Sequence, residues 1–465
     1  MAKTVSASLP YGAGPGQSDS NRSQDVQFAR QSNRTRISVW PMVIVIYATL
    51  LPREACIHIG GNYLYADRLA LLLMTPWIIV NLWRGVIKFV LPDWLILTMG
   101  VWIVISMCVN LGIDRGLFSG SAFAIDAVGG YFLARVSFHS LTDVRRGLIL
   151  CAPAVFLAAS TLPMESFAHH PIVRPAFEKV FGSVRTLEGT DEFHGLLRIE
   201  IRHGLMRAYG PWAHPIIAGL FLSTLVGIYW MSGIRGWPRW LALAAAMLSV
   251  FSLSSATLLA LGMQFGMIGY DWLTRKVAEL TWPLLFTFFA LFLGGVEVYS
   301  KSGLIPLVVR FLTLDPTTGY FRLLIWQFGW ISVLHHPWFG IGLSDYSRPE
   351  WMISNSVDAH WLLLAMRYGV IPSAALFISC LSALFALGRS QAYANPRDRR
   401  FYRGIMFSLF TFVVMGFTVY IFGGTQTWFT ILLGACVACS QHGFSWVVIL
   451  PDEERAAPQD VLAKI

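Results

Sequence analysis

A single charged residue interrupts the stretch TGYFRLLIWQFGW, residues 318–330. This residue is Arg322, and the rest of the stretch holds two tryptophans, two phenylalanines and a tyrosine. A guanidinium binds anionic oxygens in pairs through its planar fork and stays charged. The alternative is that the apolar stem of Arg322 lies in a membrane interface while its head sits among lipid phosphates. Both interpretations place an anion beside this side chain.

A second segment, GLMRAYGPWAHPIIAGLF, residues 204–221, combines an arginine with a histidine at a predicted helix start. His214 precedes Pro215, and proline is favoured in the first turn of a helix. The positive end of the helix dipole attracts anions at such a point, and Arg207 lies upstream on the chain. A plain helix start with a basic residue at an interface is the competing interpretation.

A third segment, SVDAHWLLLAMRYG, residues 356–369, places two proton acceptors at the start of an apolar block. They are Asp358 and His360, and carboxylates and imidazoles are common general bases. Because they stand two residues apart at a helix start, either side chain can face a cavity there. The residues alone leave both open as a catalytic base.

Local signals predict the element that carries Arg322. Asp315 followed by Pro316 is typical of a helix cap with proline in the first turn, and predicts a helix over 317–335. Tyr320 and Trp326 are aromatic residues of the kind that an interfacial helix presents. The glycine-punctuated segment HPWFGIGLSDY then predicts a loop that leads to the next apolar block.

The composition is not that of a soluble globular protein. Of the 465 residues, 55% are hydrophobic and only 13% are charged, against about a quarter charged in soluble chains, and the mean hydropathy is +0.57. Several apolar blocks approach the ~20 residues that cross a ~30 Å hydrocarbon core as a helix. Because backbone in lipid must satisfy its own hydrogen bonds, we predict an all-α polytopic membrane protein.

The apolar blocks predict about 12 transmembrane helices, at residues 38–52, 66–82, 93–111, 117–135, 147–163, 214–232, 238–253, 256–272, 282–298, 360–387, 404–423 and 427–449. They form a transmembrane domain over 37–450, between polar tails at 1–36 and 451–465, and the first tail is predicted to be disordered. Two connections are long, at 164–213 and 299–359.

The placement of the basic residues predicts the orientation of these spans, and it accounts for the net charge of +9. Short loops rich in lysine and arginine are cytoplasmic, and the basic loop residues of one side are Arg84, Lys88, Arg145, Arg146, Arg235, Arg239, Arg275, Lys276, Arg389, Arg397, Arg399, Arg400 and Arg403. Both termini then lie in the cytoplasm, and both long loops lie on the outer side. Since topology explains the basic excess, we expect no nucleic-acid partner.

The strings GYFRLLIW, HHPWFGIGLSDY and SVDAHWLLLAMRYGVIP, with RAYGPWAHPIIAG upstream, together resemble the O-antigen ligase/polymerase superfamily, and Wzy-type exopolysaccharide polymerases in particular. In that family an arginine ahead of a tryptophan precedes a HPxxGxG turn, and a HNxxL…ExG motif opens the following helix. The resemblance covers residues 200–375, and the twelve spans, the large outer loop and GGYFLAR extend it to the rest. It implies a GT-C-like glycosyltransferase fold.

The resemblance also implies the chemistry. Such an enzyme, without metal or cofactor, moves a glycan from an undecaprenyl diphosphate carrier to an acceptor sugar hydroxyl at the periplasmic face of the bacterial inner membrane. Arg322 and Arg207 would bind the departing diphosphate, a stabilisation worth ~3–4 kcal/mol for one such donor. His214 would assist them. Tyr320 and Trp326 would hold the lipid chain or stack on sugar rings.

The sequence departs from the family motif at the position of the base. Counting back from Gly369, Asp358 stands where the family has histidine, and Arg367 stands where it has glutamate. His360 follows two residues after the expected position. The resemblance therefore leaves the base open between Asp358 and His360.

Two charged residues fall in the fourth predicted span. Asp126 lies within the membrane, where a carboxylate is by default either paired or functional. Arg135 lies at the cytoplasmic end of GGYFLAR, where we expect an orientation anchor or a structural ion pair.

Three functions remain in competition. The favoured one is polymerisation of undecaprenyl-diphosphate-linked repeat units into exopolysaccharide or O-antigen; the second is an O-antigen ligase that transfers glycan to lipid A-core. A transporter or flippase is less favoured, because its polar residues should lie near the bilayer midplane. No metal is predicted, since the paired loop histidines lack ligand spacing. Membrane lipid, a chain-length regulator and export machinery are further expected partners.

Overall fold

The computed structural model describes residues 38–59, 62–182, 199–299, 316–352 and 355–445. The predicted tails at 1–36 and 451–465, and parts of both predicted long loops, lie outside the described residues.

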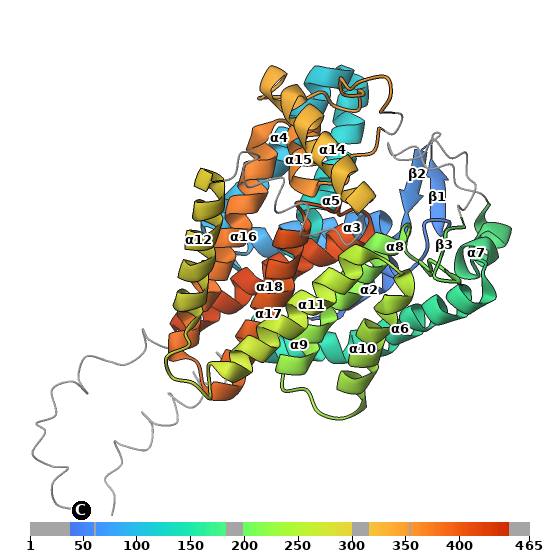
Figure 1. The fold of residues 1–465 in the computed structure, drawn as a ribbon. Coiled ribbons are helices and arrows are strands. Elements are labelled where there is room, and N and C mark those ends of the chain that lie inside the picture. The colour runs from blue at the N-terminus through green and yellow to red at the C-terminus, as the bar shows by residue number, and fades with distance from the viewer. Residues whose placement is uncertain (1–37, 60–61, 183–198, 300–315, 353–354, 446–465) are drawn as a thin grey trace, which may run out of the picture. The chain divides into compact units, whose positions relative to one another are not determined.

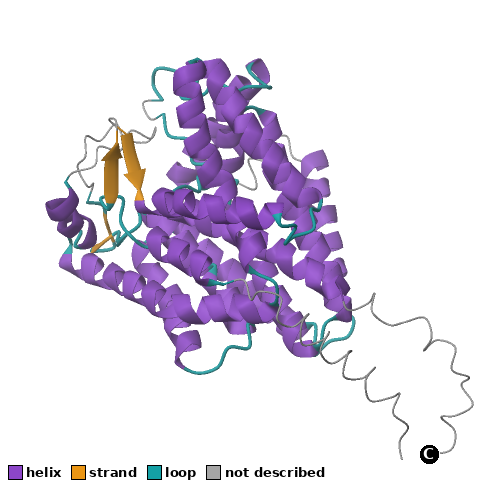
Figure 2. Ribbon diagram, turned by 180° about the vertical axis from the view of Figure 1, so that it is seen from behind, coloured by secondary structure: helices purple, strands orange, loops and turns teal. Residues whose placement is uncertain are grey.

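Helices dominate the described residues, and two short antiparallel hairpins are the strands seen there (Figures 1 and 2). The hairpins are β1 (Cys56–Ile59) with β2 (Asn62–Tyr65), and β3 (Ile201–Arg202) with β4 (Leu205–Met206). The helices, in chain order, are α2 (Trp40–Thr49), α3 (Ala66–Trp83), α4 (Leu91–Leu111), α5 (Ile113–Ser137), α6 (Leu141–Ala168), α7 (Val173–Phe181), α8 (Pro215–Ser223), α9 (Leu225–Met231), α10 (Trp237–Leu248), α11 (Ser255–Leu273), α12 (Trp282–Tyr299), α14 (Pro316–His335), α15 (His360–Tyr368), α16 (Val370–Ser390), α17 (Pro396–Met415) and α18 (Gly424–Ser445).

The helices confirm a mostly helical, membrane-embedded protein. Among the described residues, six helices are long and apolar enough to cross a membrane, namely α3, α4, α5, α6, α12 and α16. Helices also overlap each of the other predicted spans, although α17 begins at Pro396 and ends at Met415, ahead of the predicted span 404–423. The number of crossings, twelve, stays a prediction.

One predicted span is interrupted. The sequence predicts a single helix over 360–387, but the chain forms α15 and α16, which meet at Gly369. Gly369 has φ +90°, and a Cβ there would lie 1.9 Å from the carbonyl oxygen of Trp338. An apolar run continues through this point in the sequence, so hydropathy alone does not reveal the break.

The HPWFGIG segment packs against this break and supplies hydrogen-bond donors to the end of α15. The backbone N–H of Ile341 donates to the carbonyl of Met366 at 2.7 Å, and that of Gly342 donates to the carbonyl of Arg367 at 3.0 Å. Gly340 and Gly342 have φ of +61° and +63°, a backbone conformation that glycine adopts without steric cost. The turn thereby satisfies carbonyls at the end of α15, which an interrupted helix leaves without partners.

Helix α4 anchors the other side of this turn. Ser106 Oγ and Asn110 Nδ2 both donate to the carbonyl of Phe339, at 2.6 and 2.9 Å. Trp102 Nε1 donates to the carbonyl of Trp338 at 2.9 Å, and its ring stacks on Phe339 with an interplanar angle of 2°. The motif therefore has a structural role, because it fixes α15 against α4.

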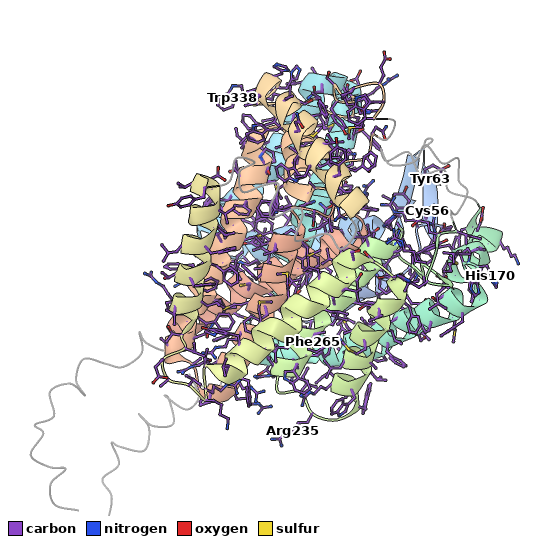
Figure 3. The ribbon with its side chains drawn as sticks, viewed as in Figure 1. Cys56, Tyr63, His170, Arg235, Phe265 and Trp338 are labelled. Atoms are coloured by element: carbon purple, nitrogen blue, oxygen red, sulfur yellow. The ribbon has the colours of Figure 1, made fainter. Side chains whose placement is uncertain are left out.

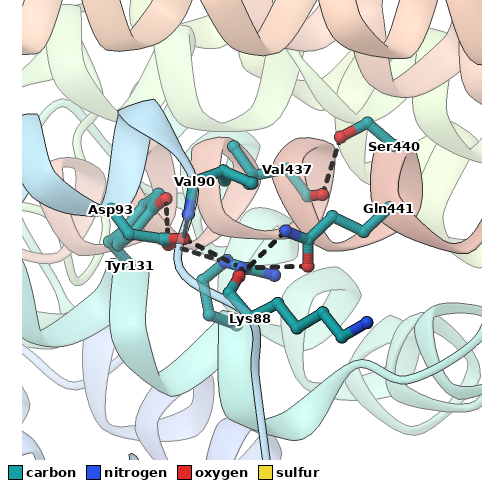
Figure 4. A network of polar contacts seen from close by, with 8 residues as sticks. Lys88, Val90, Asp93, Tyr131, Val437, Ser440 and Gln441 are labelled. Carbon is teal, nitrogen blue, oxygen red and sulfur yellow. Dashed lines mark hydrogen bonds and ion pairs between the residues drawn. The ribbon is translucent and has the colours of Figure 1, made fainter.

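A buried ion pair ties α4, α5 and α18 together (Figure 4). Arg135 and Asp93 are 2% and 0% exposed, and Arg135 donates to both carboxylate oxygens at 2.8 and 3.0 Å. Tyr131 donates to the same carboxylate at 2.7 Å, and the side-chain carbonyl of Gln441 accepts from Arg135 at 3.1 Å. Of the two roles expected for Arg135, the structure shows the structural ion pair.

The basic connections carry their own counter-charges. Arg145 pairs with Asp398 at 2.6 Å, and the buried Asp271 contacts both Arg275 and Arg403. Arg235, in the connection between α9 and α10, lies at the opposite end of the helices from Trp338, which follows α14 (Figure 3).

Candidate functional site

Arg322 lies in the second turn of α14 and is buried, with 5% of its surface exposed. Its Nε and Nη1 atoms find no hydrogen-bond partner among the described residues. Burial lowers the pKa of Arg322, and the negative charge of Asp358 opposes this shift. A buried charge with unused donors is unfavourable unless an anion supplies acceptors, so Arg322 is a ready site for one.

Packing between α14 and α15 fixes Arg322 in this position. The two helices lie side by side (Figure 1), and their shared core also includes residues of the connection between them. Its buried members are Leu324, Ile325, Val333, Tyr346, Met352, Val357, Ala359, Leu362, Leu363, Ala365 and Met366. Arg322 is itself almost fully buried beside this core, so water reaches its guanidinium poorly.

The two aromatic residues predicted to contact substrate lie in different surroundings. Tyr320 is 58% exposed and meets only the edge of Phe321 among the ring contacts described. Trp326 is held by the protein: its Nε1 donates to the carbonyl of Phe417 at 2.9 Å, and its ring stacks on Phe417. Tyr320 is therefore the more accessible of the two.

The two candidate bases face different neighbours. Asp358 accepts a hydrogen bond from Ser356 at 3.2 Å and acts electrostatically on Arg322. Burial raises the pKa of Tyr346, and the charge of Asp358 adds to that rise. Asp358 is thus the carboxylate that partly balances Arg322.

His360 is 1% exposed and begins α15. Its ring lies against Trp361, Tyr420 and Phe429, and its Nδ1 finds no hydrogen-bond partner among the described residues. Its backbone N–H donates to the carbonyl of Gly416 at 2.8 Å. The imidazole is therefore fixed in place with one ring nitrogen unused.

Arg207, by contrast, already has a counter-charge. It is buried, and its Nη1 donates to Glu200 Oε2 at 2.5 Å. Burial raises the pKa of Glu200, but the hydrogen bond and charge of Arg207 outweigh this effect and hold the pKa below its usual range. His214 caps α8 by accepting the N–H of Ile216 at 3.2 Å. This arrangement makes Arg207 and His214 a support for the loop as well as a candidate anion site.

Glu165 organises the connection between α6 and α8, and the sequence analysis did not identify it. This buried carboxylate on α6 accepts two backbone N–H groups on each oxygen: Ile172 and Val173 at 3.0 and 3.2 Å, and Tyr209 and Gly210 at 3.3 and 2.8 Å. It joins the start of α7 to the RAYGPW segment. A glutamate near the end of a predicted span was the available signal, since such a carboxylate needs donors.

A polar pocket that the sequence did not predict lies at the start of α15. We call it the arginine pocket, because Arg53, Arg68 and Arg367 line it, and it encloses a volume of ≈ 60 Å³. Its other polar lining residues include Asp67, Asp126, Trp212, His360, Tyr420 and Gln426. Connections and helix ends that are distant in the sequence therefore meet at one place.

The arginine pocket accounts for Asp126. Arg68 Nε donates to both oxygens of Asp126 at 3.0 and 3.1 Å, and Arg68 Nη2 donates to Oδ2 at 2.5 Å. Of the two roles expected for a carboxylate inside a span, pairing is observed, and the pair lines a pocket. The sequence gave a partial signal, since Arg68 lies near the start of one predicted span and Asp126 lies at the middle of another.

The structure does not gather every predicted site residue at one point. His360 lines the arginine pocket, whereas Arg322, Arg207, Asp358 and His214 are not among its lining residues. A second pocket of ≈ 100 Å³, lined by Asp345, Tyr346 and Val357 among others, lies in the Asp358 region. Arg367, Leu363 and Tyr420 line both pockets, so the two cavities share a wall.

No cluster of three or more histidine, cysteine, aspartate or glutamate side chains with metal-binding geometry occurs in the part of the chain that the structure describes. Comparison with protein-family models and with curated proteins gives no match.

Proposed function

We propose that this protein is a metal-independent glycosyltransferase that polymerises undecaprenyl-diphosphate-linked oligosaccharide repeat units at the periplasmic face of the bacterial inner membrane. The proposal includes twelve spans, cytoplasmic termini and two periplasmic loops. Its support is the resemblance of the motifs around Arg322 to Wzy-type polymerases, together with the chemistry of that residue.

The observation that carries the proposal is the buried guanidinium of Arg322, with two nitrogens that lack partners among the described residues. When the anomeric carbon–oxygen bond breaks, the diphosphate leaving group gains negative charge. Donors that are already in place, in a site poor in water, stabilise that charge without reorganising. Asp358 balances Arg322 before the donor binds, which reduces the cost of holding a buried charge.

His360 is the base that the geometry favours. It lines a pocket in which an acceptor sugar can lie, and its unused Nδ1 is able to take the proton of the attacking hydroxyl. The negative charge of Asp358 instead acts on the guanidinium of Arg322. A general base contributes about 10²–10⁴ to the rate, so we expect His360→Gln to lose that factor in turnover while Asp358→Asn changes donor binding.

Deletion of the gene separates the competing functions. Loss of long polymer with single repeat units left on the carrier or acceptor supports polymerisation. Intact lipid-linked polymer that is not attached to lipid A-core shows a ligase, and unchanged glycans show transport of another compound. Either of the last two results overturns the proposal.

Purified protein then tests the role of Arg322. Arg322→Ala should reduce chain growth by about 10²–10³, as expected for the loss of one charged donor, and Arg322→Lys should restore part of it. Arg115→Ala is the matched control, because Arg115 is an exposed arginine at the start of α5. Full activity of a folded Arg322→Ala protein would remove the main assignment.

A further inference from the structure

The second pocket is lined by residues of the HPWFGIGLSDY segment and of α15, and we name it the loop pocket. It encloses ≈ 100 Å³, well above the ~10–15 Å³ that one water molecule needs. Its polar lining side chains include Asp345, Tyr346 and Asn355. A carboxylate, a hydroxyl and an amide together donate and accept hydrogen bonds, so the loop pocket suits a ligand that does both.

Tyr346 has a buried hydroxyl that the protein does not use. The residue is 6% exposed and belongs to the core that packs α14 against α15. Its Oη finds no hydrogen-bond partner among the described residues. Burial raises the pKa of Tyr346, so the hydroxyl keeps its proton. Buried polar groups in native proteins are normally satisfied, and this atom therefore indicates a polar ligand.

The segment that carries Tyr346 is held in place by its own residues. Arg348 contacts the carboxylate of Asp345, donates to the carbonyl of Met352 at 2.8 Å, and lies 5.3 Å from the ring centre of Tyr346. The backbone N–H of Tyr346 donates to Asp345 Oδ1 at 2.9 Å. Because these contacts need no ligand, the hydroxyl is positioned before a substrate binds.

The loop pocket lies beside the proposed diphosphate site. Tyr346 shares a core with Leu324 and Ile325, which follow Arg322 closely on α14. The negative charge of Asp358 acts on both Arg322 and Tyr346. A group that is bonded to a diphosphate at Arg322 can therefore extend into the loop pocket.

We propose that the loop pocket binds the sugar ring that is bonded to the diphosphate of the donor, and that Tyr346 Oη hydrogen-bonds a hydroxyl of this ring. The inference rests on the proposed function, which places the diphosphate at Arg322. A neutral sugar suits this pocket better than the diphosphate itself, because the carboxylates of Asp345 and Asp358 disfavour an anion. The wall that the loop pocket shares with the arginine pocket then brings the donor sugar next to the acceptor sugar.

Calorimetric titration of the purified full-length chain in lipid nanodiscs tests the inference. The probes are farnesyl diphosphate alone, as a short form of the carrier lipid, and farnesyl diphosphate that carries glucose, galactose or N-acetylglucosamine. We expect at least one of the three sugars to tighten binding about tenfold, as for one or two net hydrogen bonds. Equal or weaker binding of all three glycosylated probes would overturn the assignment.

Tyr346→Phe locates the binding, because it removes the hydroxyl and keeps the ring. It should weaken the favoured glycosylated probe about three- to tenfold and leave farnesyl diphosphate alone unchanged. The unfolding temperature should stay the same or rise, because the lost hydroxyl has no partner in the protein. Unchanged binding of the glycosylated probe, a lower unfolding temperature or a failure to fold would each refute the role of this hydroxyl.

Tyr229→Phe is the matched control. The hydroxyl of Tyr229 is also buried, but it donates to the carbonyl of Leu148 at 2.6 Å. Its loss should therefore lower the unfolding temperature and leave the binding of every probe unchanged. The two substitutions thus have opposite expected effects on stability and on sugar binding.

Methyl glycosides of the same three sugars distinguish the donor from the acceptor. Tyr346→Phe should leave their binding unchanged, since they carry no diphosphate to bring them to the loop pocket. Weaker binding of a methyl glycoside, with unchanged binding of the glycosylated diphosphates, would place the acceptor in the loop pocket and overturn the assignment to the donor.

Failure of this inference is distinguishable from failure of the proposed function. Polymer formation that Tyr346→Phe leaves unchanged, with equal binding of all farnesyl probes, refutes the donor-sugar site and leaves the polymerase. Sugar-dependent binding that Tyr346→Phe weakens, without any polymer formation, refutes the polymerase and leaves a binding site for glycosylated lipid diphosphates.

Discussion

Replacement of Glu165 by glutamine should loosen the connection between α6 and α8, because this carboxylate holds two of its segments. Each carboxylate oxygen accepts two backbone N–H groups, and an amide keeps only one oxygen. Two buried N–H donors would then face an NH₂ group. Each donor left unsatisfied costs about 1–3 kcal/mol of stability. Part of this loss is offset because a buried charge disappears. We expect a net destabilisation of about 3 kcal/mol.

Thermal unfolding in detergent, followed by tryptophan fluorescence, measures the loss of stability from Glu165→Gln. Limited trypsin digestion should show faster cleavage in the β3–β4 hairpin, which precedes the segment that Glu165 holds. Glu350→Gln is the control, since Glu350 is exposed and surface substitutions usually change stability by less than ~0.5 kcal/mol. An unchanged unfolding midpoint and unchanged cleavage for Glu165→Gln would refute the role of Glu165 in the loop.

Three further outcomes follow from the geometry. Gly369→Ala should lower stability by about 2–3 kcal/mol, because its Cβ would overlap the backbone carbonyl of Trp338; thermal unfolding checks this. Arg135→Met should cost about 3–5 kcal/mol by leaving Asp93 charged and buried, and adding Asp93→Leu should recover most of it in the same assay. The pKa of Glu200 is held low in the folded protein, so its contribution to stability is present above its unfolded pKa near 4.5 and is lost as the pH falls through the lowered value. Unfolding midpoints measured from pH 6 to 3 should therefore fall less steeply in Arg207→Gln than in the unchanged protein.

The sequence allowed prediction of the helices and their membrane character, because apolar block length depends only on local composition. The helix predicted over 317–335 is α14, Pro316–His335, since its cap and proline are also local signals. The break at Gly369 was not predictable in this way, because the conflict is with the carbonyl of Trp338, a residue from another segment.

The arginine pocket could not be predicted from the sequence. Arg53 follows α2, Arg68 lies in the first turn of α3 and Arg367 lies in α15, so whether they meet depends on how these helices pack. The basic loops predict which side of the membrane each helix end faces, but they do not predict which helix ends are neighbours. Of the sequence predictions, only that of a paired or functional carboxylate at Asp126 concerned a residue pair of this pocket. Its partner, Arg68, was not identified before the fold was known.

Two residues of α14 should have different effects on the kinetics of the proposed reaction. Arg322 has donors that no described residue uses, and the diphosphate gains charge only as the bond breaks, so this contact strengthens in the transition state. Tyr320 is 58% exposed, and a lipid chain or sugar ring packed on it keeps the same contacts throughout the reaction. Interactions of the first kind raise kcat, and those of the second kind lower KM. Arg322→Lys should therefore lower kcat, whereas Tyr320→Ala should raise the KM for the donor at nearly constant kcat. A rise in KM alone from Arg322→Lys would mean that this guanidinium binds the ground state and the transition state equally, and its role in the chemical step would be refuted.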